Sequence, residues 1–156
     1  MSVLSPKSLR CTVAPTASVE EARERMVEFN VGSLVVMGER QQQRAAGGPS
    51  SAHSAVVGIF TERDYLRKFR PAASQVVADV MTPDVKTVTG ETTLADCMEL
   101  MIEGDFRHVP VLLPAAGEQH GGDGEFIGVI SMRDVIREVR CARSVGSDGL
   151  APAARH

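Results

Sequence analysis

Apolar and polar positions along the chain follow one order twice. In the first half, apolar residues at helical spacing run from Val19 to Phe29 and precede Ser33 and a continuous apolar run at 34–37. A second apolar run at 55–60 follows a polar connection, and another helical pattern begins after it. Helical spacing indicates a helix and short apolar runs indicate buried strands. With a short extended piece before the turn at 14–18, this half is predicted as β-α-β-β-α.

The second half repeats this order with matching residues. The two halves align at an offset of 75, which drops to 70 after a connection rich in Gly, Gln, Ser and Ala that is longer in the first copy. Such connections are predicted to be mobile loops, at 38–55 and 114–125. The alignment pairs Thr12 with Thr87, Ser18 with Thr93, Met26 with Met101, Val36 with Val111, Gly58 with Gly128, Thr61 with Ser131, Arg63 with Arg133, and Asp64 with Asp134.

The predicted fold is α+β (mixed α/β), with two β-α-β-β-α repeats. One three-stranded repeat buries too little surface to be comfortably stable alone. The two repeats are therefore expected to pack sheet to sheet about a pseudo-twofold axis.

The first helix of each repeat carries a start signal. Ser18 is followed three residues later by Glu21, and Thr93 by Asp96, which is the spacing of an N-terminal capping box. The apolar stripes of these helices are predicted to face the core: Val19, Ala22, Met26 and Phe29 in the first, and Leu94, Cys97, Met101 and Ile102 in the second.

The second helix of each repeat begins with a related motif, Thr-Glu-Arg-Asp at 61–64 and Ser-Met-Arg-Asp at 131–134. One interpretation is structural: the hydroxyl caps the helix, and the aspartate favours the positive end of the helix dipole. The other is a ligand site, because free N–H groups at a helix start bind anions and a carboxylate can accept both hydroxyls of a ribose. The residues alone leave both interpretations open.

Charge and cysteine content narrow the classes of function. The net charge of −3 gives no basic footprint for nucleic acid, and no apolar run approaches the length of a membrane helix. Cys11, Cys97 and Cys141 are odd in number and widely spaced, which favours a reducing compartment and predicts no metal site. Cys97, on an apolar stripe, is predicted to be a core residue.

Catalysis finds little support in the sequence. It contains no G-x-S-x-G elbow, no H-E-x-x-H, no P-loop and no dinucleotide-binding G-x-G-x-x-G. The glycine-rich stretch at 121–125 does not join a strand to a helix, so it is interpreted as a hairpin loop. We therefore predict that the chain is not an enzyme, and assign no catalytic or metal-binding residue and no cofactor.

Taken together, the motifs resemble a tandem pair of cystathionine-β-synthase (CBS) domains, the Bateman module, and in particular small stand-alone CBS-pair proteins. The resemblance rests on Asp-Val-Met-Thr-Pro at 79–83, Arg-His-Val-Pro-Val-Leu at 107–112 and the two junction motifs. The first repeat departs from it where Asn-Val-Gly-Ser at 30–33 replaces the basic pair. The boundaries predicted are CBS domain 1 at 10–70, a linker at 71–80, CBS domain 2 at 81–141 and a flexible C-terminal tail at 142–156.

The resemblance implies that the junction aspartates bind the ribose of adenosine nucleotides, with AMP, ADP or ATP as the regulatory ligand. The pseudo-twofold would give two clefts between the sheets, and Asp134 is favoured because its repeat also supplies Arg107 and His108. Phosphate contact is assigned to Arg107 and His108, with Arg63 and Arg133 as further candidates. The adenine ring would lie against backbone near Thr87. The predicted ligand residues are Thr12, Val31, Gly32, Ser33, Thr61, Arg63, Asp64, Thr87, Arg107, His108, Pro110, Ser131, Arg133 and Asp134, and Phe106 is expected in one wall.

The function predicted is a nucleotide-binding regulatory module that acts in trans on a partner protein. The family implies a homodimer packed through the helices, and neither a nucleic acid nor a membrane is expected as a partner. The alternative is a constitutive interaction scaffold whose pockets no longer bind nucleotide. Localisation is predicted as cytoplasmic, or organellar (mitochondrion or plastid) if a transit peptide has been removed.

Overall fold

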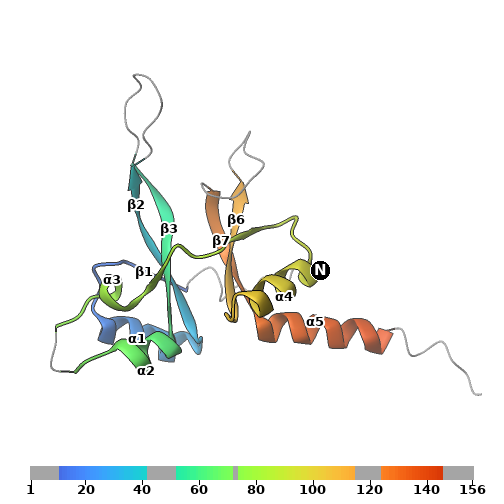
Figure 1. Ribbon diagram of the computed structural model, residues 1–156, viewed down its shortest axis with the longest axis horizontal. Helices are drawn as coiled ribbons and strands as arrows, with labels where there is room; N and C mark the ends of the chain where they lie inside the picture. Colours follow the sequence, from blue (N-terminus) through green and yellow to red (C-terminus); the bar gives the residue numbers. More distant parts are fainter. Residues whose placement is uncertain (1–10, 42–51, 72–73, 115–123, 146–156) are drawn as a thin grey trace, which may run out of the picture.

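The computed structural model describes residues 11–41, 52–71, 74–114 and 124–145. The first repeat contains β1 (Thr12–Val13), α1 (Val19–Phe29), β2 (Ser33–Gln41), β3 (Ala52–Thr61) and α2 (Glu62–Lys68). The second contains β5 (Val88–Thr89), α4 (Leu94–Glu103), β6 (His108–Pro114), β7 (Gly124–Ser131) and α5 (Met132–Val145). The order β-α-β-β-α predicted for both repeats is confirmed. Figure 1 shows the β2–β3 and β6–β7 pairs side by side, with helices beside each.

The two sheets share one pairing scheme. In each, a short first strand runs parallel to the second, and the second and third form an antiparallel hairpin. A register shift lies between Val36 and Met37 in one hairpin and between Val111 and Leu112 in the other. A β-bulge at matching positions bends both hairpins alike. The sheets contact each other through β3 and β7, as sheet-to-sheet packing requires.

The segment between the repeats spans the end of the predicted linker at 71–80 and the start of the predicted second domain at 81. It contains α3 (Val77–Val80) and β4 (Thr82–Pro83), and β4 adds a fourth strand to the first sheet by pairing with β3. Val77 and Val80 are buried in the first core. The sequence analysis predicted neither element, because α3 with four residues and β4 with two are too short to show a periodic pattern.

The first helices begin and end as capping rules require. The Ser18 hydroxyl accepts a bond from the N–H of Glu21 at 3.1 Å, and Thr93 and Asp96 form a complete capping box. Each of these helices is followed by a residue of positive φ, Asn30 at 51° and Asp105 at 48°. Asn and Asp tolerate this conformation better than most residues, so both repeats turn back towards the sheet at the same point.

Two apolar clusters form the core, one in each repeat. Val19, Ala22 and Met26 are buried, as are Cys97 and Met101, so most of both predicted stripes is confirmed. Ile102 is an exception, because its side chain is 66 % exposed. It lies one turn after Met98, which is also exposed, and Leu100 packs against the core instead.

Some predicted boundaries shift. β2 and β3 extend into the stretch predicted as a loop at 38–55, of which residues 42–51 lie outside the described residues. Helix α5 continues to Val145, past the predicted start of the tail at 142, while 146–156 are not described. No helix in the described ranges has the length and apolar character needed to cross a membrane.

Candidate functional site

Both junction motifs are capping boxes. At the start of α2, Oδ2 of Asp64 accepts bonds from the Thr61 N–H at 3.0 Å and from its hydroxyl at 2.6 Å, and the Asp64 N–H donates to that hydroxyl oxygen. At the start of α5, Oδ2 of Asp134 has the same partners on Ser131. The structural interpretation of these motifs is thus confirmed for both. In each repeat one carboxylate oxygen is used for capping, and Oδ1 is left for other contacts.

The Oδ1 atom of Asp64 is enclosed. The Lys68 ammonium lies 2.8 Å from it, and the Thr82 hydroxyl donates to it at 3.3 Å. Lys68 also donates to the carbonyls of Val80 at 2.8 Å and Met81 at 3.3 Å. The Asp64 side chain is 9 % exposed, so this carboxylate is buried and neutralised by the lysine.

The Oδ1 atom of Asp134 is more open. Within the described residues its recorded partner is Nη2 of Arg137, at 3.3 Å. The Arg137 side chain is 62 % exposed and that of Asp134 is 24 % exposed. A solvated contact of this kind contributes little and can exchange readily.

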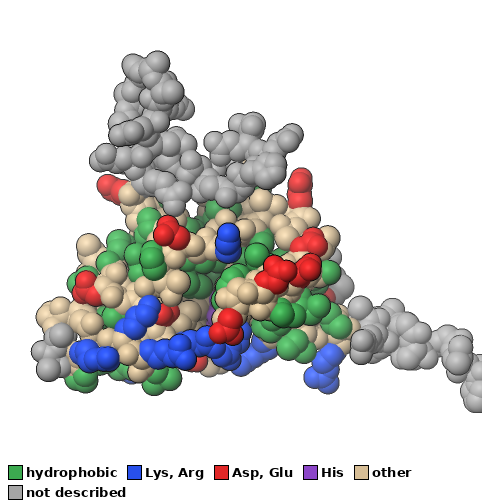
Figure 2. Space-filling view, viewed as in Figure 1, with side chains coloured by type: hydrophobic (Ala, Val, Ile, Leu, Met, Phe, Trp, Pro, Cys, Tyr) green, Lys and Arg blue, Asp and Glu red, His purple; other side chains and the backbone are tan. Residues whose placement is uncertain are grey.

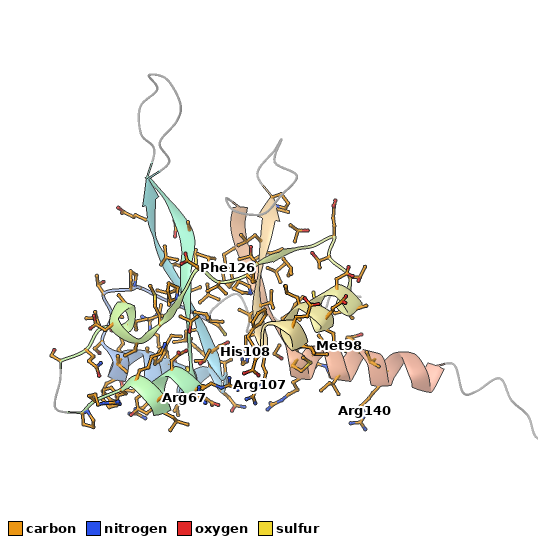
Figure 3. All side chains as sticks on the ribbon, viewed as in Figure 1. Arg67, Met98, Arg107, His108, Phe126 and Arg140 are labelled. Carbon is orange, nitrogen blue, oxygen red and sulfur yellow. The ribbon has the colours of Figure 1, made fainter. Side chains whose placement is uncertain are left out.

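The start of β6 lies beside the Asp134 junction. The Arg107 carbonyl accepts a bond from the Met132 N–H at 2.8 Å, just as the Gly32 carbonyl accepts one from Glu62 in the first repeat. His108 is the register partner of Ser131. Figure 3 shows Arg107 and His108 between the two halves of the molecule.

His108 also approaches the first repeat. A methyl group placed on Gly32 would lie 3.7 Å from Cε1 of His108 and 3.6 Å from the Glu62 carboxylate. Burial lowers the pKa of His108, and the positive charges of Arg107 and Arg133 lower it further, while Asp134 opposes them. The imidazole is therefore held in its neutral form at a point where both repeats meet.

Basic side chains, most of them arginines, lie along one edge of the molecule and include those at this junction. Figure 2 shows Lys and Arg gathered along the lower edge, and Figure 3 places Arg67, Arg107 and Arg140 there. Arg63 crosses between the repeats to Asp105, with 3.4 Å between Nη1 and Oδ2. Arg133 is exposed and lies close enough to His108 to affect its pKa. The edge is positively charged beside Asp134, as binding of an anion would require.

The remaining predicted residues lie in several environments. Thr12 pairs with Val35 in the first sheet, and its carbonyl accepts a bond from Arg25. Thr87 is half-buried just before β5. Val31 and Phe106 pack against the first and second cores respectively. No recorded contact of the described residues brings Thr12 or Thr87 to either junction aspartate.

Two predicted ligand residues are buried within strands. Ser33 is 3 % exposed and is the register partner of Thr61. Pro110 is among the fully buried side chains, and it lies in the central strand of its sheet. A proline fits there because β5 pairs with β6 only from Val111 onward. Its burial leaves it little surface for a ligand.

Three residues of the junctions were missed from the sequence: Lys68, Thr82 and Glu62. Lys68 follows Asp64 by four residues on one helix, which is a recognisable ion-pair spacing. Thr82 reaches Asp64 only through the pairing of β4 with β3, and no sequence pattern indicates that contact.

In the part of the chain that the structure describes, the other chemistry-bearing groups do not assemble into a second site. The described residues contain no group of three or more His, Cys, Asp or Glu able to hold a metal ion. Burial raises the pKa of the Cys11 and Cys97 thiols, which disfavours the reactive thiolate. The prediction that Cys97 is a core residue is confirmed.

Two equivalent repeats, each with an aspartate capping its second helix, define a tandem-repeat α+β protein. The sequence model of the CBS domain matches residues 6–70 and again 77–141. The chain therefore belongs to the CBS-domain family and contains two CBS domains in tandem.

Relatives of known sequence include stand-alone CBS-domain proteins. The chain is 39 % identical over 137 residues to the mitochondrial CBS domain-containing protein CBSX3 of Arabidopsis thaliana, covering 84 % of this chain and 56 % of that protein. It is 26 % identical over 151 residues to the chloroplastic CBSX2 of the same plant, covering 86 % and 60 %. The chain thus spans less than two thirds of the length of these relatives.

Solved structures agree with the fold. The CBS domain protein NE2398 superposes with a TM-score of 0.64 at 32 % identity, over 83 % of this chain and 86 % of that one. CBSX2 in complex with AMP superposes with a TM-score of 0.62 at 26 % identity, over 85 % and 88 %.

Proposed function

We propose that this CBS pair is a regulatory module that binds an adenosine nucleotide and acts in trans on a partner protein. The observation that carries the proposal is the grouping of Asp134, Arg107 and His108 at the start of α5. It joins a carboxylate with an open oxygen to a cationic side chain and an imidazole. The related CBSX2 has been crystallised with AMP, which supports this ligand class.

Each part of a nucleotide has a candidate group at this junction. The Asp134 carboxylate would accept the ribose hydroxyls beside Ser131. Arg107 and Arg133 would donate to phosphate, and Arg in particular offers a fork of N–H donors. A phosphate would also favour the charged form of His108, so binding of the anion would raise the lowered pKa of this group. No catalytic step is assigned to any of these groups.

Regulation requires that the ligand bind two states of the molecule unequally. The inter-repeat contacts are suited to this role, because His108 lies against Gly32, and Arg63 pairs with Asp105 across the repeats. A phosphate that attracts these basic groups would change the contacts between the halves. A change in the inter-repeat angle is the signal that we propose the partner protein detects.

The helices provide a surface for self-association. Apolar side chains on α1, α2, α4 and α5 are more than half exposed at matching positions of the two repeats: Val27, Leu66, Ile102 and Ile136. A homodimer packed through these helices would bury them. Sedimentation equilibrium should give twice the mass of the chain, and Leu66→Ser should shift the protein towards monomer while Arg67→Ser should not.

The experiment that tests ligand binding is a thermal-shift panel on protein freed of carried-over nucleotide. AMP, ADP, ATP, NADH and S-adenosylmethionine are compared. A nucleotide present at 100 times its Kd should stabilise the fold by about 2.7 kcal/mol. No shift with any of the five compounds would reject nucleotide binding and favour the alternative, a constitutive interaction scaffold.

One feature of the first repeat favours this alternative: Gly32 stands where the second repeat has Arg107.

A further inference from the structure

The two junction aspartates are equivalent in the repeat but differ in how many acceptor positions remain. A carboxylate has about four lone-pair positions for hydrogen bonds. Asp64 has four recorded donors: two on Thr61, one on Lys68 and one on Thr82. Asp134 has three within the described residues, of which one is the exposed side chain of Arg137.

The Lys68 ammonium contacts two backbone carbonyls as well as Asp64. An ammonium group has three N–H donors, and Lys68 has three acceptors within 3.3 Å: Asp64 and the carbonyls of Val80 and Met81. Moving the lysine away would leave both carbonyls and a buried carboxylate without this partner. The cost falls mainly on the carboxylate, because the Asp64 side chain is 9 % exposed whereas that of Lys68 is 43 % exposed.

Strands β3 and β4 approach each other closely beside Lys68. A Cβ on Gly58 would lie 2.9 Å from the Thr82 carbonyl and 2.6 Å from the Met81 sulfur, so only glycine lets β4 lie this near β3. Through β4, the Thr82 hydroxyl reaches Asp64, and through α3, the Val80 carbonyl reaches Lys68. The segment between the repeats thus closes the first junction.

The second repeat cannot form the same closure from its own helix. The residue that corresponds to Lys68 is Glu138, whose charge is opposite. Its nearest cationic substitute, Arg137, is the counterpart of Arg67 and reaches Asp134 from the solvent side. On the two helices themselves, the difference between Lys68 and Glu138 therefore distinguishes the closed junction from the open one.

We propose that Lys68 is a lock that makes Asp64 a structural residue and restricts ribose binding to Asp134, so that one chain binds one nucleotide. The proposal rests on the function proposed above and adds its stoichiometry and the residue responsible. The lysine acts through Asp64 and touches no ligand, so it is a positioning residue.

Isothermal titration calorimetry with AMP tests the lock. The wild-type protein should bind one AMP per chain, and Asp134→Ala should weaken binding about 10-fold or more, because hydrogen bonds to a charged group are lost. Lys68→Met should add a second binding event. Arg67→Met, which removes the same charge from an exposed neighbour, should keep one. Two AMP per wild-type chain, unchanged affinity in Asp134→Ala, or one AMP per chain in folded Lys68→Met would each overturn the lock.

The reciprocal variant keeps the test decisive if Lys68→Met does not fold. Glu138→Lys places an ammonium four residues after Asp134 and should weaken AMP binding several-fold, whereas Glu138→Gln should not. Unchanged affinity in Glu138→Lys would overturn the proposal. A wild-type protein that binds no AMP would contradict the function proposed above. In that case AMP binding gained by Lys68→Met would still support the lock, and none gained would reject it.

Discussion

The start of α2 and the start of α5 show how one motif is used in two ways. Both place an aspartate at the third position of the helix, and both use one of its oxygens for capping. The first aspartate is then enclosed by Lys68 and the segment between the repeats. The second lies beside Arg107 and His108, and its Oδ1 contacts the exposed side chain of Arg137. The motif itself therefore does not identify a ligand site. The groups around its second oxygen make that difference.

The largest expected effect comes from removing each aspartate in turn. Asp64→Ala should lower the free energy of unfolding by about 2–3 kcal/mol, because it removes the cap and a buried carboxylate that pairs with Lys68 and accepts a bond from Thr82. Asp134→Ala removes only the cap and a solvated contact, so about 1 kcal/mol is expected. Urea denaturation measures both. Equal losses would mean that the two junctions are energetically alike, against the structural comparison.

The next effect concerns ligand affinity at the open junction. Arg107→Ala should weaken AMP binding about 10-fold, as expected for the loss of a charge-assisted hydrogen bond, with little change in stability because Arg107 is exposed. Calorimetric titration provides the affinity. Arg67→Ala, on the same positive edge but away from Asp134, is the control. A similar loss in both variants would indicate general charge attraction and not a phosphate contact.

A smaller effect tests the contribution of β4 to the closed junction. Thr82→Val keeps the shape of the side chain but removes the hydroxyl that donates to Asp64 at 3.3 Å. Because this bond is long and Thr82 is exposed, a loss of about 0.5 kcal/mol in unfolding free energy is expected. In the background of Lys68→Met the same change should have a different effect, since both donors share one oxygen. Strict additivity in a double-mutant cycle would argue against a shared closure.

The smallest effect is a pH dependence at the second junction that has no equivalent at the first, because the counterpart of His108 is Ser33. The pKa of His108 is lowered from 6.5 in the folded protein, chiefly by burial. Below pH 6.5 the unfolded chain binds a proton that the folded one resists, so stability should fall as the pH decreases from there towards the folded pKa. Melting temperatures at pH 7.5 and 5.5 should therefore differ less in His108→Gln than in wild type. An unchanged difference would place the acid sensitivity elsewhere.

Most of the fold could be predicted from the sequence because local patterns carry it. Apolar runs mark the buried strands, Ser18 and Thr93 mark helix starts, and the repeat makes each observation in one half support the other. Elements of two to four residues, such as β4 and α3, have no period to detect. Ile102 shows the limit of helical spacing, because it follows the buried Met101 in the predicted stripe and is nevertheless 66 % exposed.

In the candidate site too, local features could be predicted from the sequence and contacts between distant segments could not. The two hydroxyl–aspartate pairs and their capping bonds lie within four residues of chain, so sequence was enough to find them. The closeness of Gly32 to His108, the pair between Arg63 and Asp105, and the closure of Asp64 by Thr82 join residues far apart in the chain. Capping depends on local backbone geometry, whereas access to the second carboxylate oxygen depends on which distant segment folds against it. The Asp64–Lys68 spacing is visible in the sequence, but only the tertiary structure shows that the segment between the repeats closes over this pair and leaves Asp134 open.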